Sequence, residues 1–190
     1  NWLGRHVYLL PNKKIISLGY PRCDQYYDSL LVEQKHSAKH WAKLINSNIK
    51  ESDKIILYTP TWRPYEYSFP LEKMSGFDLE NFNVWLKAND TYFFYTIHTA
   101  KIPMSMIGAR DRIIFIDPWE FPLFDINEFM NEVDVLLNDY STTSVDFSLL
   151  ERPQIFFMPD FSKAISTDGA TPPAPITKTV FLLEFLFINI

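Results

Sequence analysis

The chain has 190 residues, of which 47% are hydrophobic and 16% aromatic, and its formal net charge is −5. This length and composition are typical of one folded globular domain and exclude a disordered chain. The acidic balance argues against nucleic acid as the main partner, because nucleic-acid binding needs a positive field along the phosphates.

The first half of the chain alternates between strand-like and helix-like segments. A short apolar run predicts a strand at 14–18, closed by the turn signal Gly-Tyr-Pro at 19–21. Helical spacing follows from Tyr26 to about Asn48, and a clear strand follows at 54–58. Two prolines at 60 and 64 then predict a rigid loop at the carboxyl end of that strand.

The second half continues the alternation. We expect helices at 79–88 and 126–131, and another that begins near Ser144. We expect strands at 92–97, 112–116, 133–137 and 154–158. Strands separated by helices are joined by right-handed crossovers and form a parallel sheet. The sequence therefore predicts an α/β fold with a doubly wound parallel sheet.

No metal site, disulfide or membrane span is predicted. The single cysteine, Cys23, excludes an internal disulfide and a zinc cluster, which fits a reducing cytoplasm. His36 and His40 are one helical turn apart but lack the glutamate of the zinc-protease motif, so we place them on a solvated helix face. The apolar run at 180–190 is shorter than the roughly 20 residues of a membrane span. We expect it to be a buried strand or helix, the alternative being an interfacial patch.

The segment 133–150 carries the strongest chemical signal. Its apolar strand stops abruptly at Asp139 and is followed by the hydroxyl residues Ser141, Thr142, Thr143 and Ser144, ahead of apolar positions at 145, 149 and 150. A helix that starts there presents unpaired backbone N–H groups and the positive end of its dipole, which suit an anion the size of a diphosphate. The alternative interpretation is that the hydroxyls only cap the helix, and no glycine-rich phosphate loop decides between the two.

Other strand ends add candidate anion donors at the same edge, because ligands of open α/β sheets lie outside the carboxyl ends of the strands. These ends carry Arg22 and Asp24, then Thr59, Thr61 and Arg63, then His98, then Asp117 and Trp119. Arg63 and His98 are the two donors most suited to converge on one anion with the hydroxyl residues.

Several of these segments together resemble one enzyme family. They are LYTPTWR at 57–63, GYPRCD at 19–24, DVLLNDYS at 134–141, Asp146-Phe147, and LERP at 150–153. In this order they are similar to the CDP-glycerol glycerophosphotransferases, the teichoic acid polymerases and primases. The resemblance covers roughly 14–160. It implies a Rossmann-like fold similar to the second, donor-binding domain of a GT-B glycosyltransferase.

The resemblance also implies the chemistry and the partners. A CDP-glycerol or CDP-ribitol donor is a substrate, no cofactor is required, and polyol phosphate passes to a lipid-linked or polymeric acceptor at the inner face of the plasma membrane. His98 and Arg63 would be catalytic. The substrate-binding residues would be Arg22, Thr61, Asp139, Ser141, Thr142 and Thr143, with Asp139 supporting the loop.

The chain departs from the family pattern in two places. The family's Trp-His-Gly segment, whose histidine is the expected base, belongs to the first domain and is absent, so we expect this chain to be inactive alone. Family members usually continue after 158–160 with a tyrosine-rich segment that contains Arg-Gly, whereas this chain has 162–175 and then the apolar run. We expect residues 1–160 to form the donor-binding domain and residues 161–190 to be a divergent or truncated tail packed on it. Two other functions stay open: a GT-B glycosyltransferase domain that uses a nucleotide sugar, and a non-catalytic nucleotide-binding module.

Overall fold

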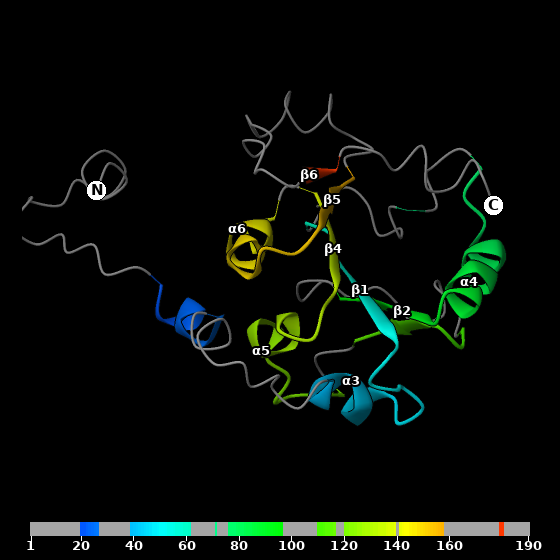
Figure 1. The fold of residues 1–190 in the computed structure, drawn as a ribbon, viewed down its shortest axis with the longest axis horizontal. Coiled ribbons are helices and arrows are strands. Elements are labelled where there is room, and N and C mark those ends of the chain that lie inside the picture. Colours follow the sequence, from blue (N-terminus) through cyan, green and yellow to red (C-terminus); the bar gives the residue numbers. More distant parts are fainter. Residues whose placement is uncertain are drawn as a thin grey trace, which may run out of the picture.

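A parallel sheet forms the centre of the computed structural model, which describes residues 20–26, 39–61, 71, 76–96, 110–116, 120–139, 141–157 and 179–180 (Figure 1). The strands are β1 (Lys54–Thr59), β2 (Thr91–Tyr95), β3 (Ile113–Phe115), β4 (Val135–Asn138), β5 (Gln154–Phe156) and β6 (Thr179–Val180). Their order is β3-β2-β1-β4-β5-β6, and every neighbouring pair is parallel. Strands β2 and β3 are added on one side of β1, and β4 to β6 are added on the other side. The strand order therefore reverses between β1 and β4, which makes this the topological switch point of a doubly wound sheet.

Helices cover both faces of the sheet. Figure 1 shows α4 (Leu79–Ala88) on one side, and α3 (His40–Ile45), α5 (Ile126–Met130) and α6 (Thr143–Phe147) on the other. The described residues also include two short 3₁₀ segments, η2 (Pro21–Cys23) and η5 (Ser148–Leu150). The predicted α/β class with a doubly wound parallel sheet is confirmed.

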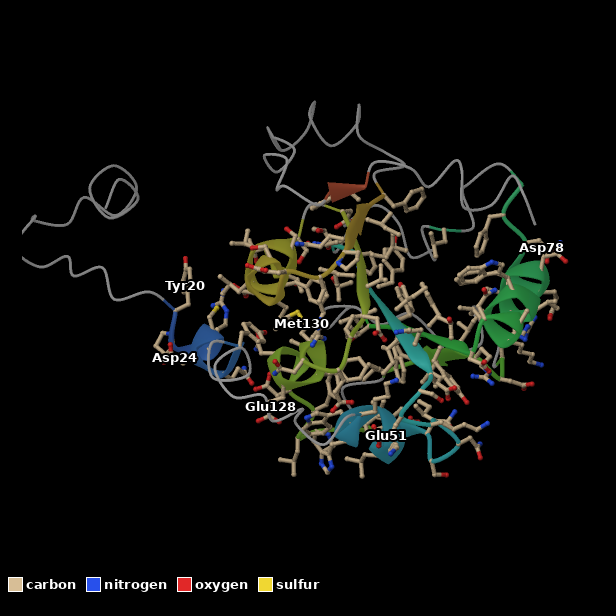
Figure 2. All side chains as sticks on the ribbon, in the orientation of Figure 1. Tyr20, Asp24, Glu51, Asp78, Glu128 and Met130 are labelled. Carbon is tan, nitrogen blue, oxygen red and sulfur yellow. The ribbon has the colours of Figure 1, made fainter. Side chains whose placement is uncertain are left out.

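The strands are mostly apolar because both faces of the sheet are covered. In β2, Tyr92 and Phe94 pack on the side of α3, α5 and α6, and Phe93 and Tyr95 pack on the side of α4. Figure 2 shows Met130 of α5 between α5 and α6, and this side chain belongs to the first of these cores. Burying one such large apolar side chain contributes about 1.5–3 kcal/mol, so continuous apolar runs are what a covered parallel strand requires.

α4 forms where the sequence predicts it because its end signals are local. Asp78 accepts a hydrogen bond from the Asn81 N–H at 2.8 Å, and Figure 2 shows Asp78 at the amino end of the helix. Phe82 and Leu86, one turn apart, are buried on the sheet side. The Phe82 ring meets the Phe93 ring edge-on with centroids 5.1 Å apart.

The prediction of one continuous helix from Tyr26 to Asn48 is wrong. Lys39 has a φ of 68°, a left-handed conformation that interrupts a helix, and α3 starts at the next residue. Glu132 accepts hydrogen bonds from the N–H groups of Trp41 and Ala42 at 2.8 and 2.9 Å, so its carboxylate caps the new helix start. Burial raises the pKa of this carboxyl, although the two N–H groups act in the opposite direction. The helix ends at Ile45 because Asn46 is extended.

The other predicted elements shift by one to a few residues. β2 ends at Tyr95 rather than at 97, β3 is shorter than 112–116, β4 starts at Val135 rather than 133, and β5 ends at Phe156 rather than 158. α5 ends at Met130, one residue early. His40 is exposed, as predicted. The predicted strand at 14–18, His36, the loop residues 117–119 and the tail beyond 180 lie outside the described residues.

Two of the three apolar residues named in the sequence of α6 and η5 lie on the outer face of that segment. Val145 and Leu149 are 55% and 47% exposed, whereas the predicted Leu150 is buried, together with Ser144, Asp146 and Phe147. The segment is a short α-helix followed by a 3₁₀ turn, so the spacing of a regular amphipathic helix does not apply across it.

Candidate functional site

The carboxyl ends of β1 and β4 meet at the switch point. Thr59 pairs with Asn138 in the sheet register, and each strand is followed by a polar loop. Thr61 and Asp139, both predicted site residues, therefore leave the sheet side by side. Ligands of doubly wound sheets bind in the crevice that forms at such a position.

A carboxylate joins the two loops. Asp139 is fully buried, and its two oxygens lie 2.9 and 3.0 Å from the Thr61 backbone nitrogen, which donates to them. The Thr61 hydroxyl donates to Asp139 Oδ1 at 2.7 Å. Hydrogen bonds to an ionised acceptor are about twice as strong as neutral ones. Asp139 thus holds the loop after β1 against the loop after β4.

The hydroxyl residues form a small network of their own. The hydroxyls of Ser141 and Thr143 are 2.9 Å apart, and Ser141 Oγ also accepts from the Thr143 N–H at 3.3 Å. The Ser141 carbonyl oxygen accepts from the Ser144 hydroxyl at 3.0 Å and from the Ser144 N–H at 3.3 Å. Thr142 is exposed and its side chain makes no capping bond.

This network is compatible with both interpretations of the hydroxyls, as helix caps and as donors to an anion. Ser141 satisfies N–H groups of the first turn, as a cap does. When two hydroxyls bond to each other, however, one hydrogen lies between them and the other hydrogen can be donated elsewhere. Thr142, together with one hydroxyl of the Ser141–Thr143 pair, can therefore donate to an anion at this edge.

Arg22 reaches the same helix from a distant part of the sequence. Its Nε lies 2.8 Å from Asp146 Oδ2 and its guanidinium carbon is 4.5 Å from the centroid of the Tyr20 ring. The hydrogen bond to Asp146 is the main cause that raises the pKa of Arg22. Figure 2 shows this segment, with Tyr20 and Asp24 labelled, at the side of α5 and α6. The guanidinium is therefore paired with a carboxylate of α6, and its predicted contact with a donor stays a prediction.

Cys23 lies beside the same carboxylate. Its sulfur is 3.5 Å from Asp146 Oδ1. Burial is the main cause that raises the pKa of the Cys23 thiol, and the negative Asp146 adds to it. The sequence offered no signal for this contact, because Cys23 and Asp146 are 123 residues apart.

The two predicted catalytic residues, Arg63 and His98, lie outside the described residues. The strands that precede them do share an edge, because Tyr58 of β1 pairs with Tyr95 of β2. Within the described parts of the chain, no group of three His, Cys, Asp or Glu residues is arranged to hold a metal ion. No helix in these parts is long and apolar enough to cross a membrane.

Comparison with known proteins identifies the family of this chain. The family model described as CDP-Glycerol:Poly(glycerophosphate) glycerophosphotransferase matches residues 4–180. The chain belongs to this glycerophosphotransferase family. It is 26% identical over 165 residues to the teichoic acid poly(glycerol phosphate) polymerase of Staphylococcus epidermidis, covering 84% of this chain and 21% of that protein.

A second relative acts on a different polyol. The teichoic acid poly(ribitol-phosphate) polymerase of Bacillus spizizenii is 28% identical over 152 residues, which cover 78% of this chain and 23% of that protein. The chain thus spans about a fifth to a quarter of the length of these two curated relatives.

A solved structure agrees in both sequence and fold. A histidine-to-asparagine variant of the wall teichoic acid polymerase TagF, soaked with CDPG, is 26% identical, with a TM-score of 0.57 over 84% of this chain and 37% of that chain. The chain is therefore a domain of the teichoic acid polyol-phosphate transferase family, with the α/β fold seen in TagF.

Proposed function

We propose that this chain is the donor-binding part of a CDP-glycerol or CDP-ribitol glycerophosphotransferase. The observation that carries the proposal is the Asp139–Thr61 link, which holds the hydroxyl residues 141–143 beside the end of β1 at the switch point. This is where a doubly wound sheet binds a nucleotide. The CDPG-soaked TagF structure supports a CDP-linked donor for this fold.

In the proposed reaction, a hydroxyl oxygen of the acceptor attacks the β-phosphorus of the CDP-linked polyol. A new P–O bond forms, the bond to the bridging oxygen breaks, and CMP leaves with that oxygen. The hydroxyl proton passes to a base that the family resemblance assigns to the other domain. Positioning and neutralisation of charge supply most of the catalysis in such transfers.

Each candidate residue then has one task. Thr142 and the Ser141–Thr143 pair donate to oxygens of the diphosphate, Arg63 and His98 neutralise its charge as CMP leaves, and Asp139 keeps the two loops together. The acceptor, a lipid-linked unit or a growing teichoic acid polymer, is bound by parts of the enzyme beyond this domain, at the cytoplasmic surface of the membrane.

Calorimetric titration of the chain with CDP, CDP-glycerol, CDP-ribitol and a UDP-sugar tests the proposal. We expect the cytidine nucleotides to bind and the UDP-sugar to bind much more weakly, whereas the reverse would indicate a sugar-nucleotide transferase.

Replacement of Ser141 and Thr142 by alanine should weaken CDP binding by one to two orders of magnitude, since a charge-assisted hydrogen bond is worth about 1.5–3 kcal/mol. The melting temperature of this double variant should fall by only about 2–4 °C or less, the shift that 1 kcal/mol causes in a chain of this size.

Ser148→Ala provides a matched control. The Ser148 hydroxyl donates to the Val145 carbonyl oxygen at 2.6 Å, at the other end of the same helical segment. This variant should bind CDP like the wild type. If the double variant also binds CDP normally, the hydroxyls are only helix caps and the proposal is wrong.

The proposed role of His98 is tested by pH. A histidine that faces a diphosphate is favoured in its charged form, so CDP affinity should fall as pH rises from mildly acidic to mildly alkaline. His98→Gln should flatten that profile. An unchanged profile in the variant would remove His98 from the site.

A further inference from the structure

A buried amide at the end of β4 contacts both halves of the switch point. Asn138 is fully buried at the carboxyl end of an apolar strand, in sheet register with Thr59. A buried amide is unfavourable unless its polar atoms are hydrogen-bonded, so such a residue is retained only where its partners are well placed.

Both ends of this amide have partners. Its Nδ2 donates to the Ser141 carbonyl oxygen at 3.1 Å, and its Oδ1 lies 3.3 Å from the Thr59 hydroxyl. The carbonyl oxygen of Ser141 can only accept, which sets the orientation of the amide, and the Thr59 hydroxyl then donates to Oδ1. The hydrogen-bond chain therefore runs from Thr59 through Asn138 to Ser141.

The Ser141 carbonyl is the central acceptor of the hydroxyl residues. It also receives the Ser144 hydroxyl and the Ser144 N–H. A donor that fixes this carbonyl therefore fixes the peptide before Thr142 and, with it, the direction of the hydroxyls at 141–143. Asp139 joins the same two loops through its bonds to the Thr61 backbone and hydroxyl.

We infer that Asn138 is a positioning residue for the donor site, one that orients residues 141–143 toward the diphosphate without touching it. The inference rests on the proposed function for its ligand. Asn138 is not among the predicted site residues. The inference adds that the Thr59–Asn138–Ser141 hydrogen-bond chain must be intact for tight CDP binding. A displacement of about 1 Å at a positioning group is enough to reduce a rate a hundredfold, so a fixed loop is worth keeping.

The test uses neutral variants, because an added charge would itself change the affinity for a diphosphate. Asn138→Ala should weaken CDP binding roughly tenfold by calorimetry, and Thr59→Val, which replaces the hydroxyl with a methyl group, should weaken it roughly threefold. Thr59→Val nearly preserves volume and keeps the inference testable if the alanine variant does not fold.

The chain offers a matched control for each variant at the opposite edge of the sheet. Asn83 is buried and accepts from the Arg112 N–H at 3.1 Å, and the buried Thr91 hydroxyl donates to the Asn89 carbonyl oxygen at 2.8 Å. Asn83→Ala and Thr91→Val should lower the melting temperature comparably and leave CDP affinity within a factor of about two. Equal loss of affinity in the controls, or normal affinity in both site variants, would overturn the inference.

Amide hydrogen exchange of the unliganded chain separates the inference from the proposed function. Asn138→Ala should speed exchange at Thr143 and Ser144 roughly tenfold, and leave Phe82 of α4, whose N–H bonds to the Asp78 carbonyl oxygen, unchanged. If the wild type binds no CDP, the proposed function is wrong, and the exchange rates still decide whether Asn138 holds residues 141–143. Unchanged exchange at Thr143 and Ser144 would overturn the positioning role.

Discussion

At the scale of single residues, two carboxylates on neighbouring elements hold distant segments together. Asp139 binds the backbone and hydroxyl of Thr61, and Asp146 binds Arg22 and Cys23. Asp139 is fully buried and its partner is a backbone N–H, whereas Arg22 is partly exposed. An ion pair that reaches solvent contributes little to stability, so we expect Asp139 to be the more important of the two for folding.

Asp139→Asn should lower the free energy of unfolding by about 1.5–3 kcal/mol, the usual worth of a hydrogen bond to a charged group. The amide replaces one acceptor oxygen with a donor that faces the Thr61 N–H. Urea denaturation of both proteins measures the difference. Asp24→Asn, at an exposed carboxylate, is the control and should change stability by less than about 0.5 kcal/mol. Equal stability of the two variants would show that the link to Thr61 contributes nothing.

Cys23 should react slowly with iodoacetamide in the folded protein. Its raised pKa keeps the thiol protonated, and only the thiolate reacts. By the same linkage, its contribution to stability is complete below the unfolded pKa of about 8.5 and is lost as pH rises through the folded pKa. Alkylation rates between pH 7 and pH 10, in buffer and in urea, measure both effects.

Asp146→Asn tests the electrostatic part of this shift. Removal of the negative charge lowers the pKa of Cys23, so the variant should alkylate faster than the wild type near pH 8. An equal or slower rate would mean that burial alone controls the thiol.

At the scale of elements, helices differ in where their end signals come from. α4 has its cap, its buried stripe and its terminating residues within one local stretch. α3 instead begins where Glu132, about ninety residues away in the chain, accepts its first N–H groups. A helix of six residues is too short to be stable alone, so its limits depend on the contacts that surround it.

Asp78→Ala should therefore lower the free energy of unfolding by about 1 kcal/mol, because the helix loses its capping acceptor. Asp78→Asn keeps an oxygen at the same place and should stay close to the wild type. Thermal or urea denaturation distinguishes the two. If both variants are equally destabilised, the charge of Asp78 matters and not its capping bond.

At the scale of the whole molecule, the chain is one doubly wound α/β unit of a family whose curated members are longer. Its aligned residues cover only 21% and 23% of two curated polymerases that it resembles. The described site lies at one edge of the sheet and contains hydroxyls, an amide and one carboxylate, all engaged in structural bonds. These groups suit binding of a diphosphate better than removal of a proton from an acceptor.

The isolated chain should therefore bind CDP-glycerol yet show no transfer to a lipid acceptor and no hydrolysis above background. Release of CMP, followed by chromatography, measures both. The full-length Staphylococcus epidermidis relative, assayed on the same acceptor, is the positive control. Measurable transfer by this chain alone would contradict the division of binding and proton removal between domains.

By itself, the sequence determined the class of fold, most strand positions, the bounds of α4 and the importance of the segment 133–150, because apolar periodicity and end signals are local properties. Only the tertiary structure decided how Lys39 breaks the expected helix, that Val145 and Leu149 face outward, and that Arg22 pairs with Asp146. It also brought Thr59 to Asn138 and Thr61 to Asp139 across 79 and 78 residues. Such pairings depend on strand order and register, and no local pattern in the sequence records which strands become neighbours.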